Sequence, residues 1–519
     1  MEIDAPDDAP PILRLPVELL LQTSSYLSVA DLFSLRLTCR HVEASIFASF
    51  CQEFFAERRF MITFSSLQAL VDISSLPRFS EYITHLTIGL DRFDTSEALP
   101  RFADYWDPVT HTARDAPLVK EGINEHKLEA FTVEQNFIVS SGKLQMMLTE
   151  ALGNLENLQE LSLRDSNARK TSSRPDSNTL LVSHGAAHVF RETGINFIDH
   201  ESHLHPHDHQ FVDIVFSALL LALARSGTQL KALTVDISKH DVGLSSSAFS
   251  LPMFLLHDLQ PTLFNLQHLD LSISFIQATL GSYSNRSAGF LSWQQHQLFK
   301  FLEQTPNLVS LRIVSKERGF VADGIIVWLA SLLERESDGH QPDKQISRPS
   351  LPHFEHKFRA LRELELINMA APATTLSKVL SCLSQSLTKL SFSKLALTVT
   401  DSDDELDNDA QKPNAWVLLL QDMYACLQLE SFAVSALEHH TPSCSRPQST
   451  GGHPVAFLPS NFGVQGRLAS GMLNTWSHTG NVTTMKDFLQ EMSIKTIVIC
   501  PRCKQNNAGY RSVEDILEA

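Results

Sequence analysis

Three stretches of the chain gather side chains that could bind a metal ion or take part in chemistry. The densest is a histidine run within ten positions, His200, His203, His205, His207 and His209. Neutral imidazole is a common ligand of Zn²⁺ and Ni²⁺, so this spacing is compatible with a metal site. Alternating histidines around a proline are more often a solvated loop, however, and this is the interpretation we favour.

The other two stretches are a pair of cysteines and an acidic run. Cys500 and Cys503 have the spacing of half a zinc site or of a redox pair, but no two further ligands follow within reach. The acidic run from Asp401 to Asp409 is compatible with a cation or a basic partner, although such runs are usually solvated. We therefore predict no metal site and no cofactor.

Familiar active-site strings are absent from the sequence. There is no Gly-rich phosphate loop followed by Lys-Ser/Thr, no Gly-x-Ser-x-Gly elbow and no His-Glu-x-x-His. A catalytic triad can be dispersed along a chain, so an enzyme in the carboxy-terminal half remains an alternative class. We predict no catalytic residues and a non-catalytic role.

The composition narrows the partners. The chain has 519 residues, of which 43% are hydrophobic, and 42 Lys+Arg against 59 Asp+Glu give a net charge of −17. Without a basic cluster, nucleic acid is not an expected partner. The longest apolar stretch, Ile214 to Ala224, is shorter than the about 20 residues of a membrane span. Seven cysteines and no export signal predict reduced thiols and a cytoplasmic or nuclear location.

The amino-terminal region contains the sharpest local pattern. Residues 1–11 are rich in Pro and acidic residues, which predicts a disordered lead-in. Pro16 then fits the first turn of a helix, and Ser28 to Asp31 has the form of a capping box for a second helix. That helix carries two apolar stripes, one of them including Phe33 and Leu37. A helix pair of about 35 residues cannot bury both stripes, so one face is expected to meet a partner.

These residues resemble an F-box over about positions 13–50. The match is carried by Leu15-Pro16-Val17-Glu18-Leu19-Leu20, Tyr26-Leu27-Ser28-x-x-Asp31-Leu32 and Leu35-Arg36-Leu37-x-Cys39-Arg40. The resemblance implies a three-helix motif that docks on a Skp-type adaptor and, through it, on the cullin of a cullin–RING ubiquitin ligase. The residues it assigns to the adaptor are Leu15, Pro16, Leu19, Leu20, Leu27, Leu32, Leu35 and Cys39.

Two details qualify the resemblance. Thr23 stands where the family usually has Ile, and residues 54–70 are similar to the segment after the F-box in many fungal F-box proteins. An ordinary amphipathic helical hairpin is the alternative interpretation of residues 13–50.

After residue 80 a pattern of the form apolar-x-x-Leu-x-apolar returns. Its fourth and sixth positions alternate like a short strand with one buried face, and helix-like stretches separate the copies. The copies span residues 83–88, 128–133, 158–163, 230–235, 266–271, 308–313, 361–366, 387–392, 429–434 and, more weakly, 494–499. This resembles leucine-rich repeats, whose units must stack to bury a core. The irregular spacing predicts a degenerate array with long insertions, and an ordinary α/β sheet is the rival.

The predicted organisation is an α/β chain with an F-box followed by an irregular leucine-rich-repeat solenoid. Its parts are a lead-in at 1–11, the F-box at 12–60, a linker helix at 61–80, the array at 81–500 and a tail at 501–519. The expected insertions are 164–210, 335–357, 398–414 and 438–460.

A protein substrate is expected on the open face of the array. Residues flanking the buried pair of a strand point to that face. The candidates are Glu160, Ser162, Arg164, His268, Asp270, Ser310, Arg312, Glu363, Glu365, Lys389 and Ser391. The F-box resemblance implies a substrate-recognition subunit of an SCF-type ubiquitin ligase, with a scaffold outside ubiquitin transfer as the alternative.

Overall fold

The computed structural model describes most of the chain in two compact units. The described residues are 10–93, 106–107, 112–113, 122–166, 181–196, 209–238, 242–274, 293–316, 323–337, 358–398, 414–440, 453–458, 464–467, 473–499 and 510–511. One unit comprises Met1–Leu230 with Thr234–His240, and the other Lys231–Leu233 with Asp241–Ala519. His200 to His207, the acidic run 401–409, Cys500 and Cys503 lie outside the described residues.

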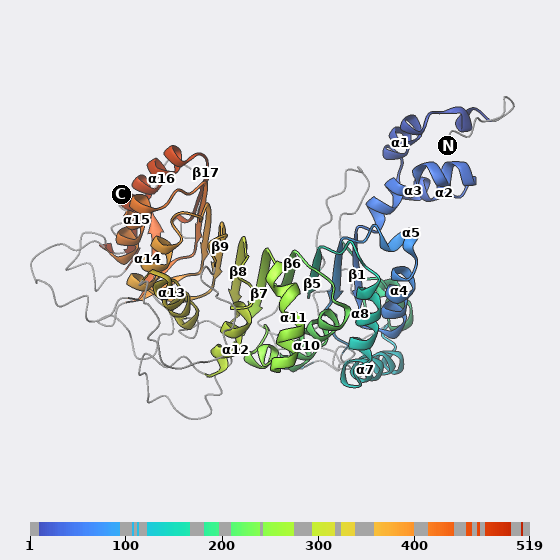
Figure 1. Cartoon of the computed structure of the whole chain (residues 1–519), viewed down its shortest axis with the longest axis horizontal. Coiled ribbons are helices and arrows are strands. Elements are labelled where there is room, and N and C mark those ends of the chain that lie inside the picture. The colour runs from blue at the N-terminus through green and yellow to red at the C-terminus, as the bar shows by residue number, and fades with distance from the viewer. Residues whose placement is uncertain are drawn as a thin grey trace, which may run out of the picture. The chain divides into compact units, whose positions relative to one another are not determined.

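The first unit begins with a small helical module. A short 3-10 helix, η1 (Pro11–Arg14), precedes α1 (Val17–Ser25), α2 (Val29–Arg36) and α3 (Arg40–Phe54). The predicted capping box is confirmed, because the Ser28 hydroxyl accepts from the Asp31 backbone N–H at 3.2 Å and donates to its carboxylate at 2.7 Å. Pro16 is the N-cap of α1, one position earlier than predicted. Helices α1 and α2 pack on α3 (Figure 1).

Three parallel strands follow in the first unit. β1 (Glu57–Met61), β2 (His85–Gly89) and β5 (Glu160–Arg164) pair in register, with Leu86 opposite Leu161 and Ile88 opposite Leu163. Since alternate residues of a strand share one face, these leucines and isoleucines form a buried row. β1 begins inside the span predicted as F-box, and the predicted linker 61–80 contains α4 (Phe64–Ser74) and α5 (Pro77–Ser80).

Helix α8 (Lys143–Gly153) packs between α4 and α10 (His209–Ser226). By length and composition α10 could cross a membrane. Its buried face, which includes Phe211, Phe216 and Leu223, nevertheless makes the extensive contact with α8 that is typical of a core helix.

The strand predicted at residues 128–133 is wrong. This segment lies inside α7 (Glu125–Ser140), which Asn124 caps by accepting from the Lys127 backbone N–H at 3.1 Å. The apolar positions continue at helical spacing, so that Leu128 and Ile138 are buried, whereas Val133 is 62% exposed. The pattern apolar-x-x-apolar fits one turn of helix as well as a strand, and the sequence beyond 133 decides between them.

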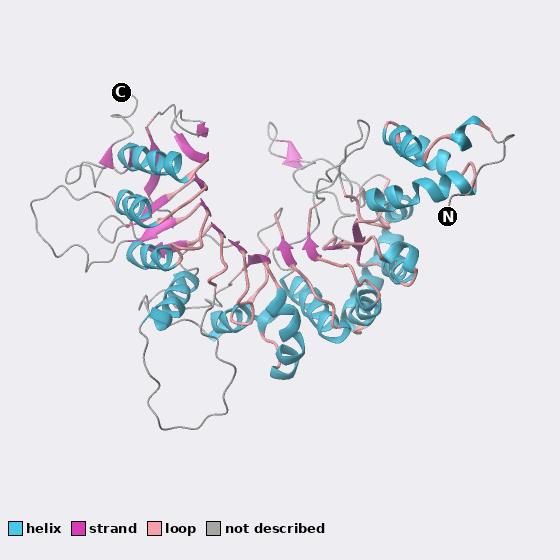
Figure 2. Cartoon of the chain, turned by 45° about the horizontal axis from the view of Figure 1, so that its top comes forward, coloured by secondary structure: helices cyan, strands magenta, loops and turns pink. Residues whose placement is uncertain are grey.

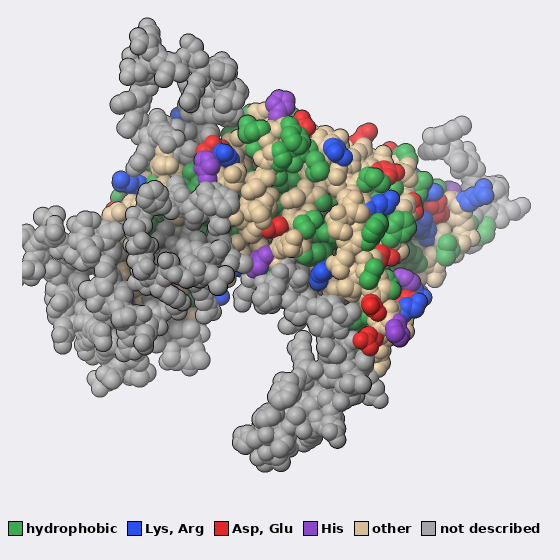
Figure 3. Space-filling model, turned by 90° about the horizontal axis from the view of Figure 1, so that it is seen from below, with side chains coloured by type: hydrophobic (Ala, Val, Ile, Leu, Met, Phe, Trp, Pro, Cys, Tyr) green, Lys and Arg blue, Asp and Glu red, His purple; other side chains and the backbone are tan. Residues whose placement is uncertain are grey.

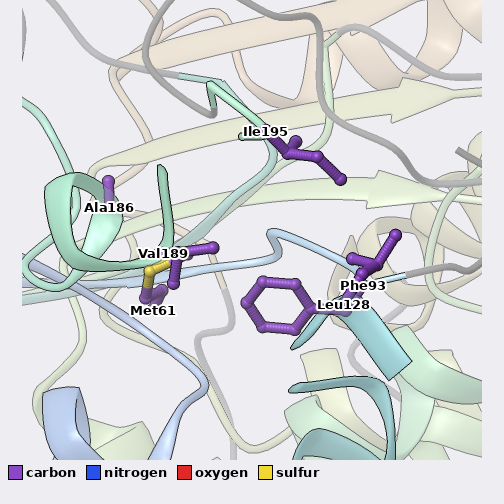
Figure 4. Packing of buried hydrophobic residues seen from close by; sticks show 6 residues of the cluster. All are labelled: Met61, Phe93, Leu128, Ala186, Val189 and Ile195. Carbon is purple, nitrogen blue, oxygen red and sulfur yellow. The ribbon is translucent and has the colours of Figure 1, made fainter. Parts of the chain in front are cut away.

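Helices α7 and α9 (Ala186–Thr193) close over the end of the first strand. Met61 meets Leu128, Val189 and Phe93 in one apolar cluster (Figure 4). His184 lies beside β1 as an isolated parallel bridge to Phe60, and its backbone N–H donates to the Arg59 carbonyl at 2.7 Å. The open edge of β1 is therefore partly covered, which protects a strand edge from pairing with other chains.

The second unit repeats strand and helix in sequence. Five parallel strands, β7 (His268–Ile273), β8 (Ser310–Ser315), β9 (Glu363–Ile367), β11 (Lys389–Ser393) and β13 (Ser431–Ser435), pair in order, and β17 (Leu473–Thr479) joins β13 antiparallel. The helices α11 (Met253–Asn265), α12 (Trp293–Leu302), α13 (Asp323–Ser337), α14 (Ala373–Cys382), α15 (Ala415–Cys426) and α16 (Val482–Lys495) alternate with them. Helices α14, α15 and α16 stack in chain order on one side of these strands (Figures 1 and 2).

Successive strands are joined by a recurring backbone contact. In the second unit the N–H groups of Arg362 and Glu363 both donate to the Val309 carbonyl, and those of Thr388 and Lys389 both donate to the Arg362 carbonyl. In the first unit the N–H groups of Thr84 and His85 both donate to the Ala56 carbonyl, and further pairs of this kind follow. The repeated geometry shows that the strands within each unit stack as equivalent elements.

A second recurring feature follows β9, β11 and β13. Asn368, Lys394 and Ala436 come directly after these strands, with φ angles of 57°, 51° and 50°. Each left-handed residue turns the chain into a short strand, giving the parallel set β10 (Ala370–Pro372), β12 (Ala396–Thr398) and β14 (Glu438–His440). β14 and β15 (His453–Phe457) thus lie within the predicted insertion 438–460.

Further short elements occur among the described residues. They are β3 (Trp106–Asp107), β4 (Thr112–Ala113), β6 (Ala232–Asp236), η3 (Ser246–Phe249), β16 (Val464–Arg467), β18 (Thr496–Ile499) and β19 (Tyr510–Arg511).

Candidate functional site

Large apolar side chains are exposed on the helical module. Tyr26 is 76% exposed and Leu37 is 85% exposed, and four further apolar side chains between residues 12 and 37 are more than a third exposed. We call this set the apolar helix surface; its members are Ile12, Val17, Leu19, Tyr26, Phe33 and Leu37. Exposed apolar groups at this density typically mark a site of protein association.

The predicted adaptor residues divide between this surface and the interior. Leu19 and Pro16 are exposed, and Leu15 is half-buried. Leu20 and Leu32 are 1% and 2% exposed, so in the free chain they belong to the core of the module and not to an open surface. Leu27, Leu35 and Cys39 are partly buried against that core. The core cluster consists of Leu32, Val42, Ile46, Phe50 and Cys51.

The prediction omitted Tyr26, Phe33 and Leu37 as adaptor contacts. Phe33 and Leu37 are four residues apart, so they lie on the same face of the helix. This spacing could have predicted an apolar stripe that faces outward. Tyr26 follows directly after α1, where no periodicity identifies it.

The helical module is fixed to the rest of the first unit through an aromatic junction. The Phe55 and Phe79 rings stack with centroids 4.8 Å apart, and the Arg78 guanidinium lies 3.7 Å from the centroid of Phe47. The Glu43 carboxylate pairs with both Arg78 and Arg36. These contacts link α3 directly to α5.

A buried polar network lies at the carboxyl ends of β1 and β2. The Arg59 guanidinium pairs with the Asp91 carboxylate at 3.2 Å, and the Ser183 hydroxyl donates to the second Asp91 oxygen at 2.9 Å. Both charged side chains are almost fully buried. Gly89 leaves room for this carboxylate, because a Cβ there would lie 2.4 Å from the Asp91 oxygen. With every described partner inside the fold, the network is structural.

The predicted substrate residues of the second unit form cross-strand ion pairs. Asp270, Arg312 and Glu365 lie side by side in register, and Arg312 binds Asp270 at 2.7 Å and Glu365 at 3.1 Å. One row away, Lys389 donates to Glu363 at 2.5 Å. This hydrogen bond lowers the pKa of Glu363 and raises that of Lys389.

Beyond Lys389 on β11 the same face loses its charges. Ser391 lies in register with Ala433, which lies opposite Ser477. Neighbouring rows add further hydroxyls, and two cross-strand pairs, Ser431 with Thr479 and Ser435 with Thr475, lie within hydrogen-bond distance. His268 and Ser310 complete the predicted set on β7 and β8, and both are at least partly accessible.

The first unit corrects one candidate. Ser162 is 2% exposed and donates to Glu160 at 2.9 Å, so its side chain is buried and not on an open surface. Glu160 also pairs with Arg164 at 3.6 Å, and both of these remain partly accessible. The strand pattern alone carries no sign of this burial.

Metal-binding geometry is not found within the described ranges: no group of three His, Cys, Asp or Glu side chains there is arranged to hold an ion. His209, the described member of the histidine run, begins α10. On the face shown in Figure 3, basic and acidic side chains of the described residues are interspersed, so this part of the surface has no extended basic field.

The comparisons with known proteins identify the helical module. Residues 12–47 match the F-box-like family. No curated protein matches the chain. F-box domains typically bind Skp-type adaptors, and F-box proteins are generally non-catalytic parts of ubiquitin ligases, so the match suggests a role in adaptor binding.

Proposed function

We propose that this chain is the substrate-recognition subunit of an SCF-type ubiquitin ligase. The apolar helix surface binds a Skp-type adaptor, which connects the chain to a cullin, and the open faces of the strands bind a protein substrate. The observation that carries the proposal is the exposure of Tyr26, Phe33 and Leu37 inside the region that matches an F-box. A receptor of this kind does no bond chemistry and raises the local concentration of its substrate near the ligase.

The recurring backbone contacts and the repeated left-handed turns support a leucine-rich-repeat solenoid for the parts after the F-box. A side-chain contact recurs as well. Asn157 donates to the Glu81 carbonyl at 2.8 Å and Asn307 donates to the Phe264 carbonyl at 2.9 Å, each two residues before the first apolar residue of the preceding strand pattern. Such ladders are typical of stacked repeats. Membership among fungal F-box proteins and a cytoplasmic or nuclear location remain predictions.

The test is co-purification of the full chain with its partners, with and without proteasome inhibition. Recovery of both adaptor and cullin, together with proteins that accumulate only on inhibition, is expected for a ligase receptor. Recovery of the adaptor without cullin would favour the scaffold, and loss of both would contradict the proposal. Val133→Ala, which trims an exposed apolar side chain outside the F-box, should leave the recovered partners unchanged and serves as the control.

A further inference from the structure

One arginine of the first unit lies in an unusual environment. Arg58, on β1, places its guanidinium 5.3 Å from the Phe55 ring centroid and 5.7 Å from that of Phe60. Its Nη1 donates to the Phe54 carbonyl at 3.4 Å, at the end of α3. Two rings and a helix terminus therefore hold the cation in a fixed position.

No described carboxylate neutralises this charge. The Arg58 Nε is buried without a hydrogen-bond partner, and no Asp or Glu oxygen among the described residues lies within 4 Å of the guanidinium. Burial alone lowers the pKa of Arg58. Arg59, the next residue, shows the contrast, because its buried guanidinium has Asp91 as a partner. Charges withdrawn from water normally acquire an opposite charge.

His184 reports the same local charge. Its ring lies 5.5 Å from that of Phe60. Burial first, and then the positive charge of Arg58, lower the pKa of this imidazole. His184 therefore adds no second positive charge beside Arg58.

Arg58 is also continuous with the apolar helix surface. Phe54, whose carbonyl accepts from Arg58, has its ring 5.4 Å from that of Phe33, and Phe33 is an exposed member of that surface. Protein interfaces commonly surround an apolar centre with a polar rim that sets orientation and association rate. Arg58 is partly exposed and contacts Phe54, which in turn contacts Phe33, so it lies beside the apolar helix surface.

We propose that Arg58 is the receptor for a carboxylate side chain of the adaptor that docks on the apolar helix surface. The incoming carboxylate supplies the negative charge that the described residues lack around Arg58, and the planar guanidinium donates two parallel hydrogen bonds to it, a geometry that a lysine cannot reproduce. This inference rests on the proposed adaptor binding and adds one contact to it.

The test compares Arg58→Gln and Arg58→Lys in the full chain for binding to a purified Skp-type adaptor at low and high salt. We expect Arg58→Gln to weaken binding by about fivefold to tenfold at low ionic strength and to flatten the salt dependence. Arg58→Lys should fall between Arg58→Gln and the natural chain. The matched control is Arg225→Gln, which removes the same charge from an exposed position on α10.

The melting temperature separates a binding role from a structural one. Since Arg58 has no described carboxylate partner, Arg58→Gln should change it by less than about 2 °C. Adaptor affinity and salt dependence equal to those of Arg225→Gln would overturn the inference and leave the proposed function intact. A natural chain that does not bind the adaptor at all would instead overturn the proposed function. A rise in melting temperature with phosphate that requires Arg58, without any effect of Arg58→Gln on adaptor binding, would assign the arginine to a free anion and also overturn the inference.

Discussion

The helical module and the strands of the second unit expose surfaces of opposite polarity. The module exposes large apolar side chains such as Tyr26 and Leu37, whereas the sheet face exposes polar groups that already pair with each other, as Arg312 does with Asp270 and Glu365. An uncovered apolar surface gains free energy when a partner excludes water from it. A face with satisfied charges gains little from simple contact, so it is suited to selecting among partners by complementarity.

The interiors differ in the same direction. The module packs around Leu32 and Phe50, and the cluster that contains them is apolar. The strands of the first unit, by contrast, bury an ion pair, and those of the second unit bury a histidine. The stability of the module is therefore expected to depend on how well its apolar core is filled. The stability of the strands is expected to depend on keeping their buried polar groups paired.

The largest effect is expected from breaking the buried pair. Asp91→Ala removes the carboxylate that pairs with the buried Arg59 guanidinium, so the free energy of unfolding should fall by about 3–5 kcal/mol. Urea unfolding followed by circular dichroism measures the change. Asp72→Ala removes an exposed carboxylate from α4 and should cost less than about 0.5 kcal/mol. Equal losses in the two variants would show that the strands do not depend on this pair.

The second effect is on partner binding through the module. Replacing Phe33 and Leu37 together with Ala should weaken adaptor affinity by about 100-fold, because exposed anchors at the centre of an interface carry most of its energy. The melting temperature should fall by only a few degrees, because Leu37 is 85% exposed and the packing lost is that of the Phe33 ring against Phe50 and Phe54. Titration calorimetry with a purified adaptor provides the affinity. A Leu20→Ala variant should show the reverse, with large destabilisation caused by a cavity.

The third effect depends on pH and concerns the second unit. His439 on β14 lies opposite His453 on β15, and burial, followed by the charges of His453 and His440, lowers its pKa to about 4. In the unfolded chain the pKa is about 6.5, so the unfolded state binds more protons between these values. Stability is thus lost as the pH falls from about 6.5 towards 4, by about 2 kcal/mol at pH 5.

His439→Gln removes the titrating group and should flatten that part of the stability profile. Glu438, which pairs with His440 at 3.5 Å, partly offsets the positive charge of His440. This residue is kept unchanged in the variant. Unfolding free energies between pH 4.5 and 7.5 provide the comparison. Parallel profiles for the variant and the natural chain would mean that other groups cause the loss.

The sequence predicted the elements that carry a long apolar period. The strand patterns at 361–366 and 387–392 are confirmed as β9 and β11, because leucines two residues apart must share the buried face. β1 was not predicted because its sequence, Glu57-Arg-Arg-Phe-Met61, is largely charged. α11 was not predicted because it contains Pro261. The short strands β10, β12 and β14 have three residues each, which is too few for a period.

The site was harder to predict than the fold. An F-box pattern identifies which residues are apolar but not which side faces water, and Leu20 and Leu32 lie inside while Phe33 lies outside. The charge pairs of the sheet face depend on register between strands that are far apart in sequence, as Arg312 and Glu365 are. The environment of Arg58 is set by two aromatic rings and by the lack of a nearby carboxylate among the described residues. Both depend on tertiary packing, which a sequence does not show.

The fourth effect should stabilise the second unit. Ala436 has a φ of 50°, a conformation that costs an L-residue about 1 kcal/mol relative to glycine. Ala436→Gly should therefore raise the free energy of unfolding by about that amount, measured by urea unfolding. Ala433→Gly, in β13, should instead lower it by about 0.5–1 kcal/mol because the strand needs no left-handed residue there. Destabilisation by both variants would imply that the turn after β13 is not under strain.

The smallest effect tests whether the sheet face is held by its own charges. Arg312 is about one-third exposed, so its pairs with Asp270 and Glu365 are screened by water and salt. Arg312→Gln should lower the free energy of unfolding by less than about 1 kcal/mol, and a double-mutant cycle with Glu365→Gln should give a coupling of about 0.5 kcal/mol that declines in 0.5 M NaCl. A small coupling means that a substrate can rearrange these pairs at little cost, as selection by complementarity requires. A coupling of several kcal/mol, insensitive to salt, would instead make the charged rows part of the structural core and leave the hydroxyl groups of β13 and β17 as the accessible part of the face.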